Sequence, residues 1–398
     1  MTPMRIHYPA YYRDFVCTGG ACEDTCCGGW QIGIDRESYE RYRKVEGSFG
    51  KRLYREIDHK LRIFRLHDRR CAFLNDAGFC DIYKKLGRDG LCRTCRIYPR
   101  HVEDYGDLKE VMLSLSCPEA ARLILGDKEN GRFLEKDHPG KAAPLENQEF
   151  LELLTDIRQT VVCILKNRSI GWEERLAMVL AFAHDAQRRL PRTEQGFLCD
   201  RTVPESVRQE IRALSRRYLS QNAASRFLDR VSCYRKRGRE QLVRTAAFVR
   251  EAWELEPVVY GWRSRQEQLC TELYHGMNMD AYLRCRKEFN VRAAEYELEW
   301  ENLVLYFINT FVLGAVYDGD VLGKIKMVLF SYLIIREHCF AASQKAGKLT
   351  EKMLVVSAYR YSREVENSDR NLETLERRLC GRLFGMDSMM TVLLGNTD

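Results

Sequence analysis

Apolar side chains recur every three to four residues along most of the chain after residue 149. This is the period of an amphipathic helix, and we find neither a strong run of alternating apolar and polar residues nor a repeat of fixed length. The pattern therefore predicts an all-helical C-terminal domain over residues 149–398. Its expected helices cover residues 149–167, 172–189, 204–219, 239–253, 292–317, 321–344, 349–364 and 369–379.

The pattern is patchier before residue 126. Helices are predicted at 34–46, where Asp35 is a candidate N-cap, and at 50–64. A third is predicted at 117–125, because proline is tolerated in the first turn of a helix. The polar stretch 126–148 contains Pro and Gly and predicts a linker between the two halves.

Composition describes a soluble globular protein. The chain has 398 residues, of which 45% are hydrophobic and 30% charged, and its net charge of +7 is small for this length. The basic stretches 212–217 and 235–239 are typical of solvated helix faces, so no nucleic-acid partner is expected. The start of the chain has no apolar signal core, and the apolar stretch 303–316 is too short to span a bilayer. We therefore expect no membrane partner and a reducing, cytoplasmic location.

Cysteine is distributed unevenly. Nine of the sixteen cysteines lie in the first 117 residues, mostly in close groups with glycines between them. Disulfides are not expected in a reducing compartment, whereas closely spaced thiolates on glycine-containing loops are typical of metal sites. The predicted metal ligands are Cys17, Cys22, Cys26, Cys27, Cys71, Cys80, Cys92, Cys95 and Cys117. The later cysteines stand singly and are predicted to be small buried hydrophobes: Cys163, Cys199, Cys233, Cys270, Cys285, Cys339 and Cys380.

Sulfur ligands do not distinguish zinc from an iron–sulfur cluster. The alternative to either is a small core rich in buried free thiols. Four early histidines are more typical of surface or core positions than of ligands: His7, His59, His67 and His101. The expected fold class is thus mainly α, with a cysteine-rich, loop-rich metal-binding domain over residues 1–125 packed on the helical domain.

Several common catalytic motifs are absent from the sequence. It contains no dinucleotide-binding glycine fingerprint, phosphate loop, zinc-protease helix or nucleophile elbow. The CxxxCxxC motif of radical S-adenosylmethionine enzymes is also missing, because Gly29 stands where its third cysteine would follow Cys22 and Cys26.

The motifs themselves resemble the flagellin lysine-N-methylase family over nearly the whole chain. The resemblance rests on residues 15–30, 71–74, 78–82, 91–100 and 115–119, with later blocks at 315–320 and 361–369. The cysteine half also resembles a broader zinc- or iron-chelating family. The resemblance implies an S-adenosylmethionine-dependent protein-lysine methyltransferase that carries an iron–sulfur cluster, most simply 4Fe-4S, and acts on flagellin or another protein. A non-catalytic zinc- or iron-binding scaffold is the alternative.

Methyl transfer to lysine requires a neutral amine aligned with the methyl group of the donor. Tyr317, Asp318 and Asp320 offer phenol and carboxylate groups at a predicted helix end and are the candidate catalytic residues. The same residues also fit an ordinary helix end, with Gly319 in the turn and Asp320 capping the next helix.

Four polar residues in the later helices are the candidates for binding S-adenosylmethionine: Glu301, Asn302, Arg363 and Glu364. Structural ion pairs and buried hydrogen bonds are the alternative roles of these residues.

Overall fold

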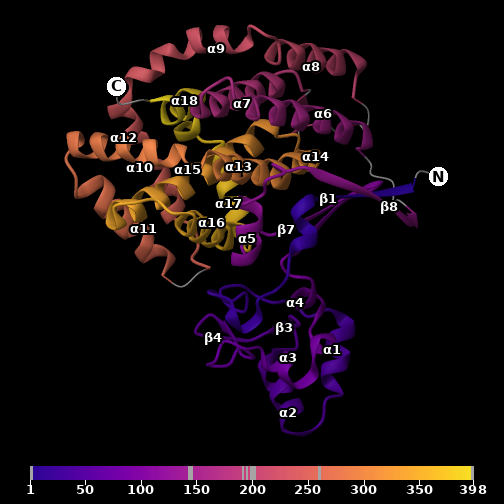
Figure 1. The fold of residues 1–398 in the computed structure, drawn as a ribbon. Helices are drawn as coiled ribbons and strands as arrows, with labels where there is room; N and C mark the ends of the chain where they lie inside the picture. Colours follow the sequence, from indigo (N-terminus) through magenta and orange to yellow (C-terminus); the bar gives the residue numbers. More distant parts are fainter. Residues whose placement is uncertain are drawn as a thin grey trace.

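The computed structural model describes residues 3–141, 147–190, 192–193, 196–197, 203–258 and 261–395. A large helical body lies above a small lobe, and a sheet lies at one side of the helical body (Figure 1). The predominance of helix in the predicted fold class is confirmed.

The small lobe contains short elements separated by loops. Its elements are α1 (Arg36–Arg43), α2 (Gly47–Glu56), β2 (Ile57–Asp58), β3 (Ile63–Phe64), β4 (Leu66–His67), β5 (Arg70–Cys71), α3 (Asp81–Leu86) and α4 (Arg93–Ile97). Asp35 caps α1, since its carboxylate accepts the amide of Ser38 at 2.9 Å as predicted. The helix predicted over 50–64 ends at Glu56, because the chain turns back there into the β2–β3 hairpin.

A four-stranded sheet joins distant parts of the first 141 residues. Its strand order is β6 (Arg100–Tyr105), β7 (Leu108–Leu113), β1 (Pro3–Pro9) and β8 (Phe133–Lys141). β1 runs parallel to β7, with Ile6 opposite Lys109, and antiparallel to β8, with Ile6 opposite Lys136. The predicted linker 126–148 therefore includes a sheet strand, because the backbone of its polar residues pairs with the N-terminal strand.

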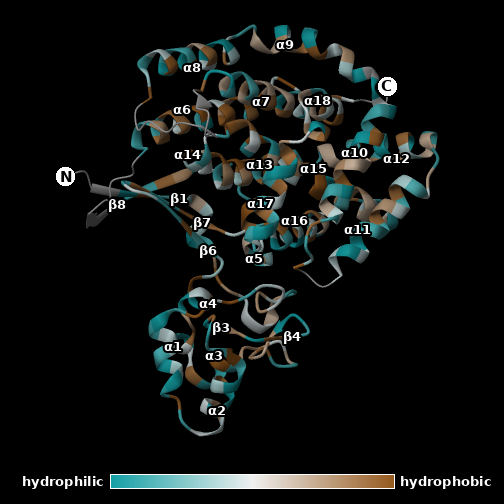
Figure 2. Ribbon diagram, turned by 180° about the vertical axis from the view of Figure 1, so that it is seen from behind, coloured by the Kyte–Doolittle hydropathy of each residue, from teal (hydrophilic) through white to brown (hydrophobic). Residues whose placement is uncertain are grey.

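The helical body is built around α15 (Val321–Ala346), which packs against α7, α13 and α16 and is buried along most of its length. Its other helices are α5 (Pro118–Leu125), α6 (Gln148–Leu165), α7 (Trp172–Gln187), α8 (Glu205–Tyr218), α9 (Ala223–Val231), α10 (Gly238–Trp253), α11 (Trp262–Cys270), α12 (Met279–Ala294), α13 (Glu297–Phe311), α14 (Ala315–Asp318), α16 (Glu351–Val365), α17 (Asp369–Leu379) and α18 (Met386–Leu394). Figure 2 shows apolar segments turned inward in these helices and polar segments on the outer ones.

The predicted helices of the second half mostly agree with these elements. The range 292–317 is divided, since α13 ends at Phe311 and a short 3-10 turn precedes α14. The sequence pattern missed α9, α11, α12 and α18. Among the residues after 149 that the structure describes, the regular secondary structure is helical apart from a hairpin of β9 (Arg192–Thr193) and β10 (Gly196–Phe197). Within the described ranges no helix has both the length and the apolar surface needed to cross a bilayer.

Two hydrophobic cores organise the chain. One lies within the small lobe and includes Ile32, Leu53, Phe64 and Phe73. The other fills the helical body and also takes in residues from the N-terminal segment and from 105–125. Packing therefore groups these segments with the helical body, whereas the sequence placed all of 1–125 in one domain.

Candidate functional site

The early cysteines come together where the small lobe meets the helical body. Two backbone hydrogen bonds join the segment around Cys27 to the segment around Cys71. The amide of Cys71 donates to the carbonyl of Cys27 at 2.7 Å, and the amide of Gly29 donates to the carbonyl of Arg69 at 2.7 Å. The carbonyl of Gly33 then accepts the Thr94 hydroxyl at 2.9 Å, next to Cys92 and Cys95. Three stretches that lie far apart in the sequence are thereby held at one place.

Three of these cysteines occupy the same local position. Cys80, Cys92 and Cys117 are the N-caps of α3, α4 and α5. Burial raises the pKa values of Cys80 and Cys117, and the backbone amides of the first helical turn offset only part of this rise. The pKa of Cys92 is lowered, chiefly by Cys95 and further by such amides. Such a position suits a thiol that acts as a metal ligand.

Two pairs of thiols are in hydrogen-bonding contact. The Cys26 thiol donates to Cys27 and lowers the pKa of Cys27 to about 7. The pKa of Cys92 is likewise lowered by a hydrogen bond from Cys95. All the early cysteines except Cys17 act on one another electrostatically: Cys22, Cys26, Cys27, Cys71, Cys80, Cys92, Cys95 and Cys117.

No disulfide joins the early cysteines, which are all free. Among the residues that the structure describes, however, no three or more His, Cys, Asp or Glu side chains are arranged to hold a metal ion. The free thiols are the kind of donor that a thiolate-bound metal requires. In the described residues, however, they lie as neighbouring pairs and not as one group around a single ion. Cys17 is exposed, and its sulfur accepts the amide of Gly19.

The four early histidines have other partners. His7, His67 and His101 contact Glu135, Glu56 and Glu103 at 2.5–2.7 Å. His59 contacts the Tyr39 hydroxyl at 2.9 Å.

The prediction for the later cysteines holds only in part. Cys270 and Cys339 are buried and Cys285 is half-buried, but Cys163, Cys233 and Cys380 are exposed. The three exposed cysteines lie on the outer faces of helices or turns. Apolar residues spaced three to four positions apart do not reveal such a face where apolar and polar residues alternate irregularly around the cysteine. Cys199 lies outside the described residues.

Arg363 of α16 connects the helical body to the cysteine segment. Its Nε donates to the carbonyl of Ser116 at 2.8 Å, and its Nη1 pairs with Asp24 at 2.8 Å. Arg363 is 4% exposed, and its charge favours the thiolate forms of Cys26 and Cys27, although the hydrogen bond to Cys27 and burial leave the pKa of Cys26 raised. The structure thus brings this candidate residue directly to the predicted metal ligands.

Glu364 holds the other side of the same contact. Its carboxylate accepts the amide of Val258 at 2.7 Å. Gly29 has a φ of +92°, and a Cβ there would lie 2.9 Å from the Val258 carbonyl. Only glycine fits this approach of the cysteine loop to the helical body.

Glu366 is a half-buried acid beside this junction. It accepts the Tyr306 hydroxyl at 2.6 Å, and Tyr306 in turn accepts the amide of Leu115 at 3.0 Å. Burial raises the pKa of Glu366 to about 7, and its Oε1 has no partner among the described residues.

The pKa of Glu366 predicts a pH-dependent stability. An acid whose pKa is higher in the folded state than its ordinary 4.5 destabilises the fold as pH rises from about 4.5 to 7. At pH 8 we expect the Glu366→Gln variant to exceed the parent protein in its free energy of urea unfolding by on the order of 2 kcal/mol. At pH 4.5 the two proteins should be equally stable. A difference that is the same at both pH values would contradict this assignment.

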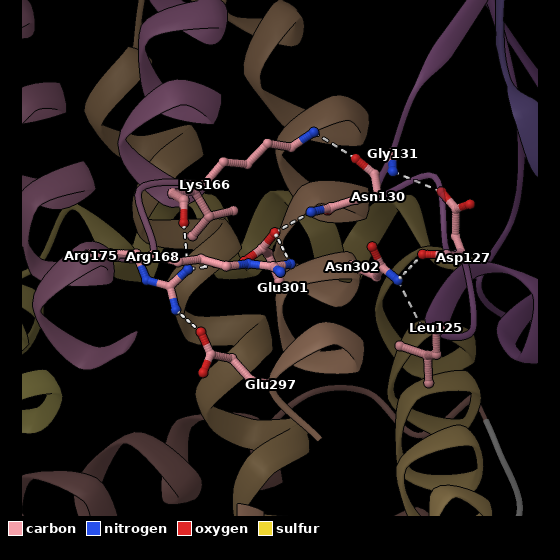
Figure 3. A network of polar contacts seen from close by, with 11 residues as sticks. Leu125, Asp127, Asn130, Gly131, Lys166, Arg168, Arg175, Glu297, Glu301 and Asn302 are labelled. Atoms are coloured by element: carbon pink, nitrogen blue, oxygen red, sulfur yellow. Dashed lines mark hydrogen bonds and ion pairs between the residues drawn. The ribbon is translucent and has the colours of Figure 1, made fainter. Parts of the chain in front are cut away.

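Glu301 and Asn302 lie in a polar network inside the helical body (Figure 3). Glu301 of α13 pairs with Arg175 of α7 at 2.9 Å and with Arg168 at 3.2 Å. Asn302 donates to the carbonyls of Leu125 and Asp127 at 2.9 and 2.8 Å. The carboxylate of Glu301 is thus fully engaged in structural ion pairs, whereas the Oδ1 of Asn302 is buried without a hydrogen-bond partner among the described residues.

Asp318 and Asp320 lie together in the turn between α14 and α15, where the Oδ1 of Asp318 accepts the amide of Asp320 at 2.9 Å. Tyr317 is 68% exposed and faces the acidic residues Glu103 and Asp104 of β6. Asp318 pairs with Lys324 at 2.7 Å, and Asp320 caps α15 by accepting the amide of Gly323 at 2.8 Å. Gly319 has a φ of +68°, as a turn between two helices requires.

The capping contact makes a prediction for Asp320. Asp320→Ala should lower the free energy of unfolding by about 1 kcal/mol, because α15 loses its side-chain cap. Asp320→Ser should retain most of that stability, which urea denaturation will measure. A serine variant as unstable as the alanine variant would show that capping is not the role of this residue.

These features define a mainly helical protein in which a small thiol-rich lobe docks, through a buried arginine, on a large helical body. The family model described as the FliB lysine N-methylase C-terminal domain matches residues 158–392, which is more than half of the chain. The chain therefore belongs to the FliB lysine N-methylase family.

Curated relatives agree with this family. The chain is 28% identical over 147 residues to the Lysine-N-methylases of Salmonella choleraesuis (strain SC-B67) and Salmonella typhimurium (strain LT2), a stretch that covers 34% of this chain and 36% of each relative. It is 28% identical over 145 residues to the Flagellar biosynthetic protein FliU of Salmonella muenchen, covering 34% of this chain and 86% of that protein. The match thus spans about a third of the two lysine methylases. No solved structure matches the chain.

Proposed function

We propose that this chain is a cytoplasmic, S-adenosylmethionine-dependent protein-lysine N-methyltransferase that acts on flagellin. The observation that carries the proposal is the match of residues 158–392 to the lysine N-methylase family. The names of the Salmonella relatives, which include a flagellar biosynthetic protein, support flagellin as the substrate.

We also propose that the early cysteines hold an iron–sulfur cluster, with zinc as the alternative metal. Support comes from the free state of the thiols, their mutual electrostatic contact and the three thiols at helix N-termini. When bound, such a group would stabilise a loop-rich lobe and could carry electrons. Cys17 is the candidate ligand with the least support, because it is exposed and apart from the others.

The chain's own residues have distinct parts in this proposal. Arg363 and Glu364 position the cysteine segment on the helical body and would line a donor site at that junction. The exposed Tyr317 hydroxyl beside Glu103 and Asp104 offers an acidic surface to which a substrate lysine would be attracted. Asp318 holds that helix end in place through its ion pair with Lys324, and Asp320 does so by capping α15. Glu301 and Asn302 stabilise the core of the helical body.

The test uses the full chain, purified and reconstituted without oxygen. It is mixed with methyl-labelled S-adenosylmethionine and a flagellin, and the label on lysine is counted after acid hydrolysis. Label on lysine supports the methyltransferase. Label found only on another added protein would show that flagellin is not the substrate. Absence of both binding and transfer would favour the scaffold. A visible absorption spectrum with elemental analysis on the same sample separates iron–sulfur from zinc.

A further inference from the structure

A cavity of about 430 Å³ lies between α11, α15 and α16, on the helical side of the thiol junction. It is open to solvent on one side, and its volume is in the range of small-molecule sites. Apolar surface from Trp262, Leu269, Met353 and Val356 makes up much of its wall. None of the roles described above uses this cavity.

Two arginines contribute to the positive charge of the cavity, which Lys345 and Lys352 also line. Arg265 of α11 and Arg360 of α16 both line it, and neither makes an ion pair with any residue that the structure describes. The Nη2 of Arg265 is buried without a hydrogen-bond partner in the described chain. Burial and the neighbouring Arg360 lower the pKa of Arg265, which shows that its positive charge is held in an unfavourable place.

The nearby acids offset this charge only in part, since Glu364 and Asp24 favour the charged form of Arg265 but burial and Arg360 outweigh them. Asp24 interacts with Arg265 electrostatically, but its carboxylate is paired with Arg363 at 2.8 Å. Glu272, which also lines the cavity, is paired with Lys345 at 2.8 Å. His338 adds no charge of its own, because burial lowers its pKa to about 4 and leaves the ring neutral at pH 7.

A buried guanidinium nitrogen without a hydrogen-bond partner costs free energy that folding alone does not return. The same group forms strong, directional hydrogen bonds with the oxygens of a carboxylate or a phosphate. The apolar wall beside the arginines can cover the uncharged part of the same molecule.

We infer that this cavity binds a small organic anion, whose carboxylate or phosphate oxygens are held by Arg265 and Arg360 and whose apolar or aromatic part lies against Trp262. This site goes beyond the proposed function. The oxyanion could be the amino-acid carboxylate of S-adenosylmethionine, an assignment that rests on the proposed function, or the phosphate of a nucleotide.

Calorimetric titration of the full chain tests the inference with three probes: S-adenosylhomocysteine, ADP and inorganic phosphate. At least one should bind, and Arg265→Met should weaken that binding by about tenfold or more, because a charge-assisted hydrogen bond is lost. Binding of S-adenosylhomocysteine alone assigns the cavity to the methyl donor, whereas binding of ADP or phosphate alone assigns it to a phosphate ligand.

Arg263→Met is the matched control, since Arg263 is an exposed arginine on the same helix that does not line the cavity. Arg263→Met should bind the probe like the parent protein. Because Arg265 makes no ion pair in the described part of the chain, Arg265→Met should melt at the same temperature as the parent or higher. Arg360→Gln provides a second variant if Arg265→Met does not fold. Failure of all three probes, or equal binding by the parent, Arg265→Met and Arg360→Gln, would overturn the inference. The binding result is independent of lysine methylation, so the two proposals can fail separately.

Discussion

Cys26→Ser and Cys95→Ser are each expected to lose most of the metal bound per chain and to destabilise the small lobe. Each residue belongs to a hydrogen-bonded thiol pair, and the two cysteines also interact electrostatically across the pairs. Serine is a poor ligand for zinc or iron at neutral pH because its hydroxyl keeps its proton. Structural metal can contribute on the order of 10 kcal/mol to folding, so a lobe of short helices and two-residue strands should depend on it strongly.

The measurement is metal per chain by elemental analysis, together with limited proteolysis of the small lobe. Cys270→Ser is the control, because Cys270 is also a buried cysteine but lies in α11, far along the chain from the thiol junction. Its metal content should be unchanged. Equal metal loss in all three variants, or no metal in the parent protein, would exclude the proposed ligands.

Glu301→Ala is expected to have the largest effect on the stability of the helical body. Glu301 is fully buried and pairs with Arg175, which is itself 1% exposed. The alanine variant keeps the Arg175 charge in the core with only the more exposed Glu297 to oppose it. Removing one partner of a buried ion pair costs roughly 3–5 kcal/mol.

Urea denaturation followed by far-ultraviolet circular dichroism will measure this loss. Glu373→Ala is a suitable control, since Glu373 is an exposed glutamate on α17 with no ion pair in the described chain, and it should change the unfolding free energy by less than about 0.5 kcal/mol. A stable Glu301→Ala variant that no longer binds S-adenosylmethionine would instead support the cofactor role suggested by the sequence.

The sequence by itself determined the features that depend on residues close together in the chain. Apolar spacing gave most of the helices after residue 149, since the side chains three and four positions apart share one helix face. Local capping rules identified Asp35 as the cap of α1. They also gave Asp320 a possible role as the cap of α15, as an alternative to a catalytic role. Cysteine spacing identified the thiols that lie at the junction.

Only the tertiary structure decided the contacts between distant residues. β1 finds its partners in β7 and β8, more than a hundred positions later, and its own seven residues carry too weak an alternation to reveal a strand. The same holds for Glu301, whose partner Arg175 lies 126 positions earlier, and for Arg363, which binds the Ser116 carbonyl across 247 positions. Whether a charged side chain forms a structural ion pair, as Glu301 does, or keeps an unpartnered nitrogen among the described residues, as Arg265 does, depends on which side chains packing brings beside it. Local sequence patterns do not contain that information.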